Sequence, residues 1–114
     1  MPLWTSALRP PTVDPPRAIA DGSPVSEPLD RYIFGPDQQC FGCGPHNHGG
    51  LRLTFTRDAE EVTVRWLPAA PYEGPPGLLH GGIQSTLADE LAAWTVIGLR
   101  GLMGLTSSLQ LRFV

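Results

Sequence analysis

One histidine followed by two glycines, His80-Gly81-Gly82, stands directly before an apolar stretch that is predicted to be helical. Glycine permits backbone conformations that other residues avoid, and it lets a ligand approach the main chain closely. The first N–H groups of a helix have no partner within the helix, and the helix dipole adds partial positive charge there. The segment therefore predicts a place that favours an oxyanion. The alternative is an ordinary helix start with a loop glycine pair and a surface histidine.

Asp89 is a carboxylate within the same helical stretch, on a side made mostly of small residues. Because that side is expected to be packed, a charged group on it indicates a chemical role. The alternative is a structural ion pair with an arginine such as Arg52 or Arg65. The neighbouring Glu90 falls among bulky residues, and we expect it to cap or brace a nearby loop.

Four candidate metal ligands lie close together upstream: Cys40, Cys43, His46 and His48. Thiolate and imidazole are ligand types that zinc prefers, but structural zinc sites normally draw the second pair from further along the chain. The alternatives are a small zinc-binding module and a tight glycine-rich turn with two half-buried thiols. Two cysteines so close together do not form a disulfide framework, which favours a reducing compartment.

The helix itself is predicted over residues 83–97, because apolar side chains recur there at helical spacing. Glycines at 98, 101 and 104 are expected to end it. One face is bulky and the opposite face is small, so we expect packing on both sides. The bulky face consists of Ile83, Leu87, Leu91, Trp94 and Ile97.

Two segments upstream of the helix, residues 51–56 and 61–67, alternate apolar and polar side chains, as half-buried strands do. The polar residues 57–60 between them predict a turn, so the two segments should form a hairpin. Residues 105–114 alternate in the same way and predict a third strand. The expected fold class is therefore α+β, with an antiparallel sheet.

Eight of the 13 prolines fall within residues 1–36, which have no sustained apolar period. We expect this segment to be disordered, or to be an arm lying over another surface. The folded domain is then predicted over residues 37–114.

Composition narrows the function classes further. All eight basic residues of the 114 are arginines, they are scattered, and the net charge is −3, so nucleic acid is not an expected partner. The most apolar stretch, residues 91–99, is too short for a bilayer, which takes ~20 residues. The first residues lack the apolar core of a secretory signal. A cytoplasmic protein without a membrane segment is expected.

The run GLLHGGIQSTLADE, residues 77–90, resembles the active-site segment of hotdog-fold acyl-CoA thioesterases of the phenylacetate-pathway (PaaI-like) type. In that family an acid lies nine positions after the histidine of a His-Gly-Gly loop, and here that position is Asp89. The upstream run Cys-Phe-Gly-Cys-Gly, with Asn47 after it, is similar to the lead-in of one bacterial subgroup. The likeness extends over residues 40–114.

The resemblance implies a hotdog fold, in which an antiparallel sheet wraps around one long helix. It also implies hydrolysis of acyl-CoA to a free acid and coenzyme A, without a metal or a bound cofactor. Asp89 would be the base or nucleophile, the N–H groups of Gly81 and Gly82 would polarise the thioester carbonyl, and His80 would shape the site. The family is oligomeric, so a homodimer or homotetramer is expected.

Two further positions are expected to contact substrate: Asn47 in the lead-in and Thr106, which matches a hydroxyl early in the following strand. Gly74 stands where some relatives have asparagine, and Ala93 stands where others have serine or threonine. The family's sheet continues beyond the equivalent of Val114, which implies a truncated or partial chain. A non-catalytic hotdog protein that binds acyl-CoA is the remaining alternative.

Overall fold

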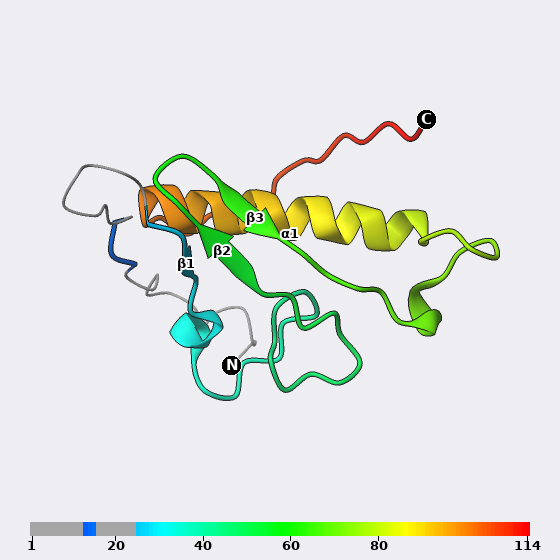
Figure 1. The fold of residues 1–114 in the computed structure, drawn as a ribbon, viewed down its shortest axis with the longest axis horizontal. Coiled ribbons are helices and arrows are strands. Elements are labelled where there is room, and N and C mark those ends of the chain that lie inside the picture. Colours follow the sequence, from blue (N-terminus) through cyan, green and yellow to red (C-terminus); the bar gives the residue numbers. More distant parts are fainter. Residues whose placement is uncertain (1–12, 16–24) are drawn as a thin grey trace.

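The computed structural model describes residues 13–15 and 25–114, and the observations below concern those residues. Three short strands form an antiparallel sheet in the order β1–β2–β3, and one long helix packs against it (Figure 1). This arrangement confirms the α+β class. The elements are the strands β1 (Glu27–Pro28), β2 (Phe55–Arg57) and β3 (Val62–Val64), the helix α1 (Gly81–Arg100), and the 3-10 helices η2 (Arg31–Phe34) and η3 (Ala70–Tyr72).

The helix α1 contains the predicted segment and continues through Arg100. Its C-cap is Gly101, whose φ of 64° lies in the left-handed region that glycine adopts without strain. Gly98, which was expected to end the helix, instead lies inside it, so that expectation is wrong. A Cβ at Gly98 would be 3.0 Å from the side chains of Leu29 and Val62, so the helix packs tightly against these two residues there. In the described part of the chain, no helix is long and apolar enough to cross a membrane.

Aromatic rings make up the centre of the core between α1 and the sheet. The Trp94 ring stacks on Phe55 at a centroid distance of 5.2 Å and meets the edge of Phe34 at 5.8 Å. Trp94 and Ile97 are buried, which confirms the predicted bulky face of the helix. The other three residues of that face, Ile83, Leu87 and Leu91, are partly buried and pack against the same core.

The predicted hairpin is present as the antiparallel pair β2–β3, with Phe55 opposite Val64 and Arg57 opposite Val62. Both strands are shorter than predicted. Leu51 and Leu53 are buried as the alternation indicates, but their N–H groups donate to the carbonyls of Phe41 and Gly42, each at 2.8 Å. The glycine-rich loop therefore occupies the edge that a longer strand would use.

Part of the segment expected to be disordered is folded. β1 pairs with β2. Leu29, the next residue, is buried, and its N–H donates to the Phe55 carbonyl at 2.8 Å. The buried Arg57 holds this region together, because its guanidinium pairs with Glu27 at 3.0 Å and donates to the Gly98 carbonyl at 2.6 Å. Residues 1–12 and 16–24 of the expected disordered segment lie outside the described residues.

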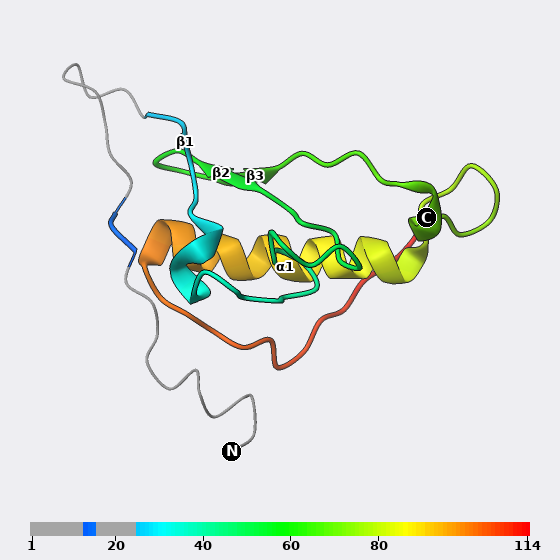
Figure 2. The same ribbon diagram turned by 90° about the horizontal axis from the view of Figure 1, so that it is seen from below.

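The predicted third strand over residues 105–114 is wrong, because this segment is extended but belongs to no strand. It runs back along α1 on the side opposite the sheet, where no strand of the described residues offers backbone partners (Figure 2). Its apolar side chains are largely uncovered: Leu105 is 90% exposed and Phe113 is 57% exposed. Leu109 and Leu111 are exposed as well.

Candidate functional site

Asp89 lies about midway along α1, half-buried, on the side that faces the C-terminal segment. The hydroxyl of Thr106 donates to its Oδ1 at 2.5 Å, so the structure brings together two predicted site residues that are 17 positions apart. The alternative ion pair with Arg52 or Arg65 does not form among the described residues, and Arg52 instead contacts the ring of His48 at 3.1 Å. Asp89 is therefore held by a neutral hydroxyl, which orients the carboxylate, and no cation of the described residues pairs with it.

The start of α1 is closed by the side chain of His80. Its Nδ1 accepts the Gly82 N–H at 3.0 Å, and its carbonyl accepts the N–H groups of Ile83 and Gln84, both at 3.0 Å. Among the described residues, the Gly81 N–H has no hydrogen-bond partner. Of the two N–H groups that the sequence suggested for an oxyanion, Gly81 is thus open and Gly82 is engaged by the histidine.

The loop before α1 packs its backbone tightly against His80. The His80 N–H donates to the Tyr72 carbonyl at 3.0 Å, and a Cβ at Gly74 would lie 3.1 Å from the His80 Cα. A side chain at Gly74 would therefore push the loop away from the histidine. Glycine at this position, where some relatives have asparagine, therefore permits the close contact between the loop and the start of the helix.

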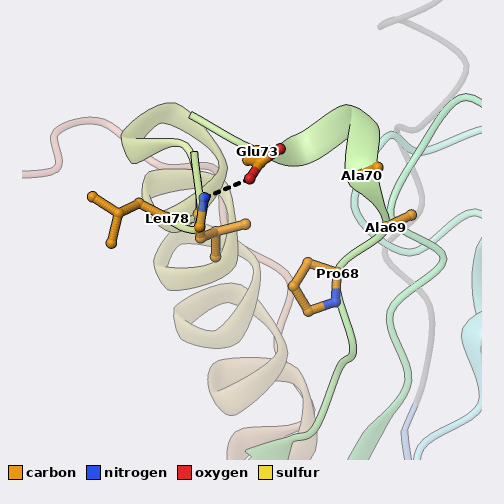
Figure 3. A pocket seen from close by; sticks show the side chains of 7 residues that line it. Pro68, Ala69, Ala70, Glu73 and Leu78 are labelled. Atoms are coloured by element: carbon orange, nitrogen blue, oxygen red, sulfur yellow. Dashed lines mark hydrogen bonds between the residues drawn. The ribbon is translucent and has the colours of Figure 1, made fainter. Parts of the chain in front are cut away.

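A shallow surface pocket of about 300 Å³ opens in this same loop (Figure 3). The carboxylate of Glu73 lies at its wall and accepts the Gly77 N–H at 2.5 Å. Sequence reasoning did not single out Glu73, because nothing in its spacing distinguishes it from a surface acid. The lining residues are Pro68, Ala69, Ala70, Glu73, Gly77, Leu78 and Leu79.

Asn47 is used within its own loop. Its Oδ1 accepts the Gly49 N–H at 3.0 Å, and its Nδ2 donates to the Gln39 carbonyl at 3.1 Å. Both polar ends of the side chain are thus engaged between residues 39 and 49. The structure does not bring Asn47 to Asp89, and it gives this residue a loop-closing part.

The two cysteines meet an acid that sequence reasoning placed only loosely. The sulfur atoms of Cys40 and Cys43 and a carboxylate oxygen of Glu90 all lie within 4.8 Å of one another. The two histidines point elsewhere, since His46 contacts the Tyr32 hydroxyl at 3.3 Å and His48 contacts an arginine. The expectation that Glu90 braces a neighbouring loop is confirmed, because its Oε1 lies 3.7 Å from the Cys40 sulfur, within hydrogen-bonding distance.

The pKa values of the three clustered groups, Cys40, Cys43 and Glu90, are shifted in different directions. The hydrogen bond from the Cys43 thiol lowers the pKa of Cys40 well below its usual value, and the same bond raises the pKa of Cys43. Burial, together with the nearby charge of Cys40, raises the pKa of Glu90 to about 7. The first negative charge of the group therefore resides on the Cys40 sulfur.

Comparison of the chain with protein-family models, with curated proteins and with solved structures finds no match.

Proposed function

We propose that this chain is a hotdog-type acyl-CoA thioesterase, active as a homodimer or a higher oligomer. One observation carries the proposal. The acid Asp89 on the helix is held by Thr106, and both residues were assigned to the site from the thioesterase-like pattern. The first turn of the same helix supplies the Gly81 N–H, which has no partner in the part of the chain that the structure describes.

In this proposal the thioester carbonyl oxygen accepts the Gly81 N–H, where the helix dipole favours developing negative charge. The Gly82 N–H becomes a second donor to this oxygen when the His80 ring turns away from it. As a general base, Asp89 takes a proton from water while the water oxygen attacks the carbonyl carbon. The tetrahedral intermediate then breaks its C–S bond, and the proton passes to the departing coenzyme A sulfur. As a nucleophile, Asp89 would itself displace coenzyme A and form an anhydride that water hydrolyses.

The two parts of the site lie too far apart within one chain. Asp89 follows Gly82 by seven residues, which is ~10 Å along the helix axis, whereas a base acts within ~3 Å of the reacting group or through one water. An antiparallel α1 from a second copy would bring its Asp89 to this helix start, and a two-fold axis would create two equal sites. Ala92 and Val96 are exposed, so α1 keeps an uncovered strip for such a contact.

The proposal is tested by measuring the release of coenzyme A from aliphatic and aromatic acyl-CoA substrates by chromatography. Asp89→Asn should lower kcat by at least about 100-fold, the usual range for loss of a general base. Asp37→Asn, which neutralises an exposed acid in a loop, is the matched control and should keep full activity. A wild-type protein that binds acyl-CoA without turnover would instead establish the non-catalytic alternative.

The shared site has its own test. Asp89→Asn protein is mixed with Gly82→Pro protein, and the subunits are allowed to reassort. Each mixed dimer would contain one intact site, so about a quarter of the wild-type activity should return. If mixed dimers form and the mixture stays inactive, Asp89 acts within its own chain or not at all.

A further inference from the structure

The glycine-rich loop and α1 bring two sulfurs and one carboxylate oxygen to a common point, within 4.8 Å of one another. Around a tetrahedral zinc ion, with Zn–S of about 2.3 Å and Zn–O of about 2.1 Å, neighbouring ligand atoms lie about 3.6–3.8 Å apart. The Cys40 sulfur and the Glu90 Oε1 are already 3.7 Å apart. A small contraction of the remaining distances would complete the ligand spacing.

From this geometry we infer that Cys40, Cys43 and Glu90 bind one zinc-class ion and thereby fasten the loop to α1. Two thiolates exclude calcium and magnesium, which take oxygen ligands, and they favour zinc among the abundant cations. Three protein ligands leave a fourth position for water. Cys40 is exposed and Cys43 is buried, so the ion can enter from solvent at the Cys40 side.

The backbone of the loop is shaped to receive the Glu90 carboxylate. A Cβ at Gly42, between the two cysteines, would lie 2.2 Å from the Glu90 Cδ and 2.5 Å from its Oε2. Any side chain at this position would therefore displace the carboxylate. The glycine lets an acid from the helix reach the two thiols, which is an observation independent of the ligand distances.

Gln38 holds both cysteines from outside the ligand set. Its Nε2 donates to the Cys43 sulfur at 3.6 Å and to the Cys43 carbonyl at 3.2 Å, and its Oε1 accepts the Cys40 N–H at 2.9 Å. Hydrogen-bonding partners of this kind orient metal ligands and fix their geometry. The two cysteines are thus positioned before any ion arrives.

The experiment uses the full chain, stripped of metal with a chelator under reducing conditions and titrated with zinc or with cobalt. We expect one equivalent to bind, with the near-ultraviolet charge-transfer absorption that cobalt–thiolate bonds give. Cys40→Ser, Cys43→Ser and Glu90→Gln should each weaken binding by at least about 100-fold, since losing only an outer hydrogen-bonding partner already costs about 10–100-fold.

Four further variants separate this ligand set from its rivals. Gly42→Ala removes no ligand but displaces Glu90, and it should weaken binding at least about 10-fold, as loss of a ligand's positioning does. Gly49→Ala in the same loop meets only a 3.4 Å contact with Asn47 and should leave affinity unchanged. His46→Ala and His48→Ala should also leave affinity unchanged. Circular dichroism establishes that each variant is folded.

Three results would overturn the inference. The reduced wild-type protein fails to bind zinc and cobalt, or binding depends on His46 or His48 and not on Glu90. Alternatively, the protein purified without reductant loses two hydrogens in mass and regains them with a thiol reductant, while the reduced form binds no metal. That last result would define a thiol–disulfide pair at Cys40 and Cys43.

Discussion

Arg57 links the sheet to the C-terminal end of α1. It is 6% exposed, lies in β2, pairs with Glu27 from β1 and donates to the Gly98 carbonyl near the end of α1. The last carbonyls of a helix have no partner within the helix, and a positive charge is favourable beside them. One guanidinium thus joins a strand, its neighbour and the helix terminus.

We expect Arg57→Met to lower the free energy of unfolding by about 3–5 kcal/mol, the range for breaking a buried ion pair by removing one partner. The carboxylate of Glu27 and the carbonyl of Gly98 would both lose this partner in a poorly solvated place. Arg65→Met, which changes an exposed arginine just after β3, should shift stability by less than about 0.5 kcal/mol. Urea titrations of the two variants make the comparison, and equal losses would contradict the account.

Cys40 should behave as a reactive thiolate in metal-free protein. Its pKa is lowered mainly by the hydrogen bond from Cys43, so it stays deprotonated at pH values where an ordinary thiol is protonated. Alkylation by iodoacetamide, mapped by mass spectrometry, should modify Cys40 rapidly at pH 7 and leave the buried Cys43 unmodified. Cys43→Ala removes the bond and should move the reaction profile to higher pH. An unchanged profile would show that Cys43 does not stabilise the thiolate.

The resemblance to the thioesterase segment predicted Asp89, Thr106 and His80 as a set, and the structure joins the first two directly. They did not predict that Glu90 meets the thiols. That contact needs the loop backbone at Gly42 to lie against α1, and no local pattern encodes how a loop seats on a distant helix. A glycine between two cysteines was the available sign.

Among the elements, α1 was the most predictable, but the place of Gly98 within it was not predicted. The helical period depends on local side-chain spacing, and the structure confirms the predicted helix, which continues for three further residues at its C-terminal end. Gly98 was expected to break the helix because of its low propensity. Packing overrides that propensity, since the side chains of Leu29 and Val62 lie against the helix at this point.

Gly98→Ala is therefore expected to destabilise the domain, although alanine is the better helix former by about 1 kcal/mol. The new methyl group would meet Leu29 and Val62 at 3.0 Å, and overpacking a core costs about 1–3 kcal/mol. A net loss near 1 kcal/mol should appear as a lower urea midpoint. Gly104→Ala adds a methyl group with nothing within 4 Å and is the control. A more stable Gly98→Ala protein would mean that the helix can move away from the sheet.

At the scale of the whole molecule, the C-terminal segment leaves apolar surface open. Leu109, Leu111 and Phe113 are between 39% and 57% exposed, on an extended backbone that pairs with no strand in the described chain. Backbone groups and apolar side chains presented together favour pairing with another chain. The alternation of residues 105–114 predicted a strand that does not form, because pairing requires a neighbour that local sequence cannot supply.

We expect the protein to associate with itself in a concentration-dependent way, visible by analytical ultracentrifugation. A triple change of Leu109, Leu111 and Phe113 to serine should shift the equilibrium toward the monomer. Leu67→Ser alters a leucine that is 91% exposed in the connection after β3, and it should have no effect on association. If the wild-type protein is monomeric at all concentrations, the exposed segment is not an interface.

The seat of Glu90 on Gly42 also has an evolutionary consequence. Because a Cβ at Gly42 and the Glu90 carboxylate would occupy the same space, neither position can change freely while the other is kept. In related chains, a larger residue at the first position should occur together with a shorter residue at the second. The two positions are 48 apart in the sequence, so such covariation would reveal this long-range contact from the sequences alone.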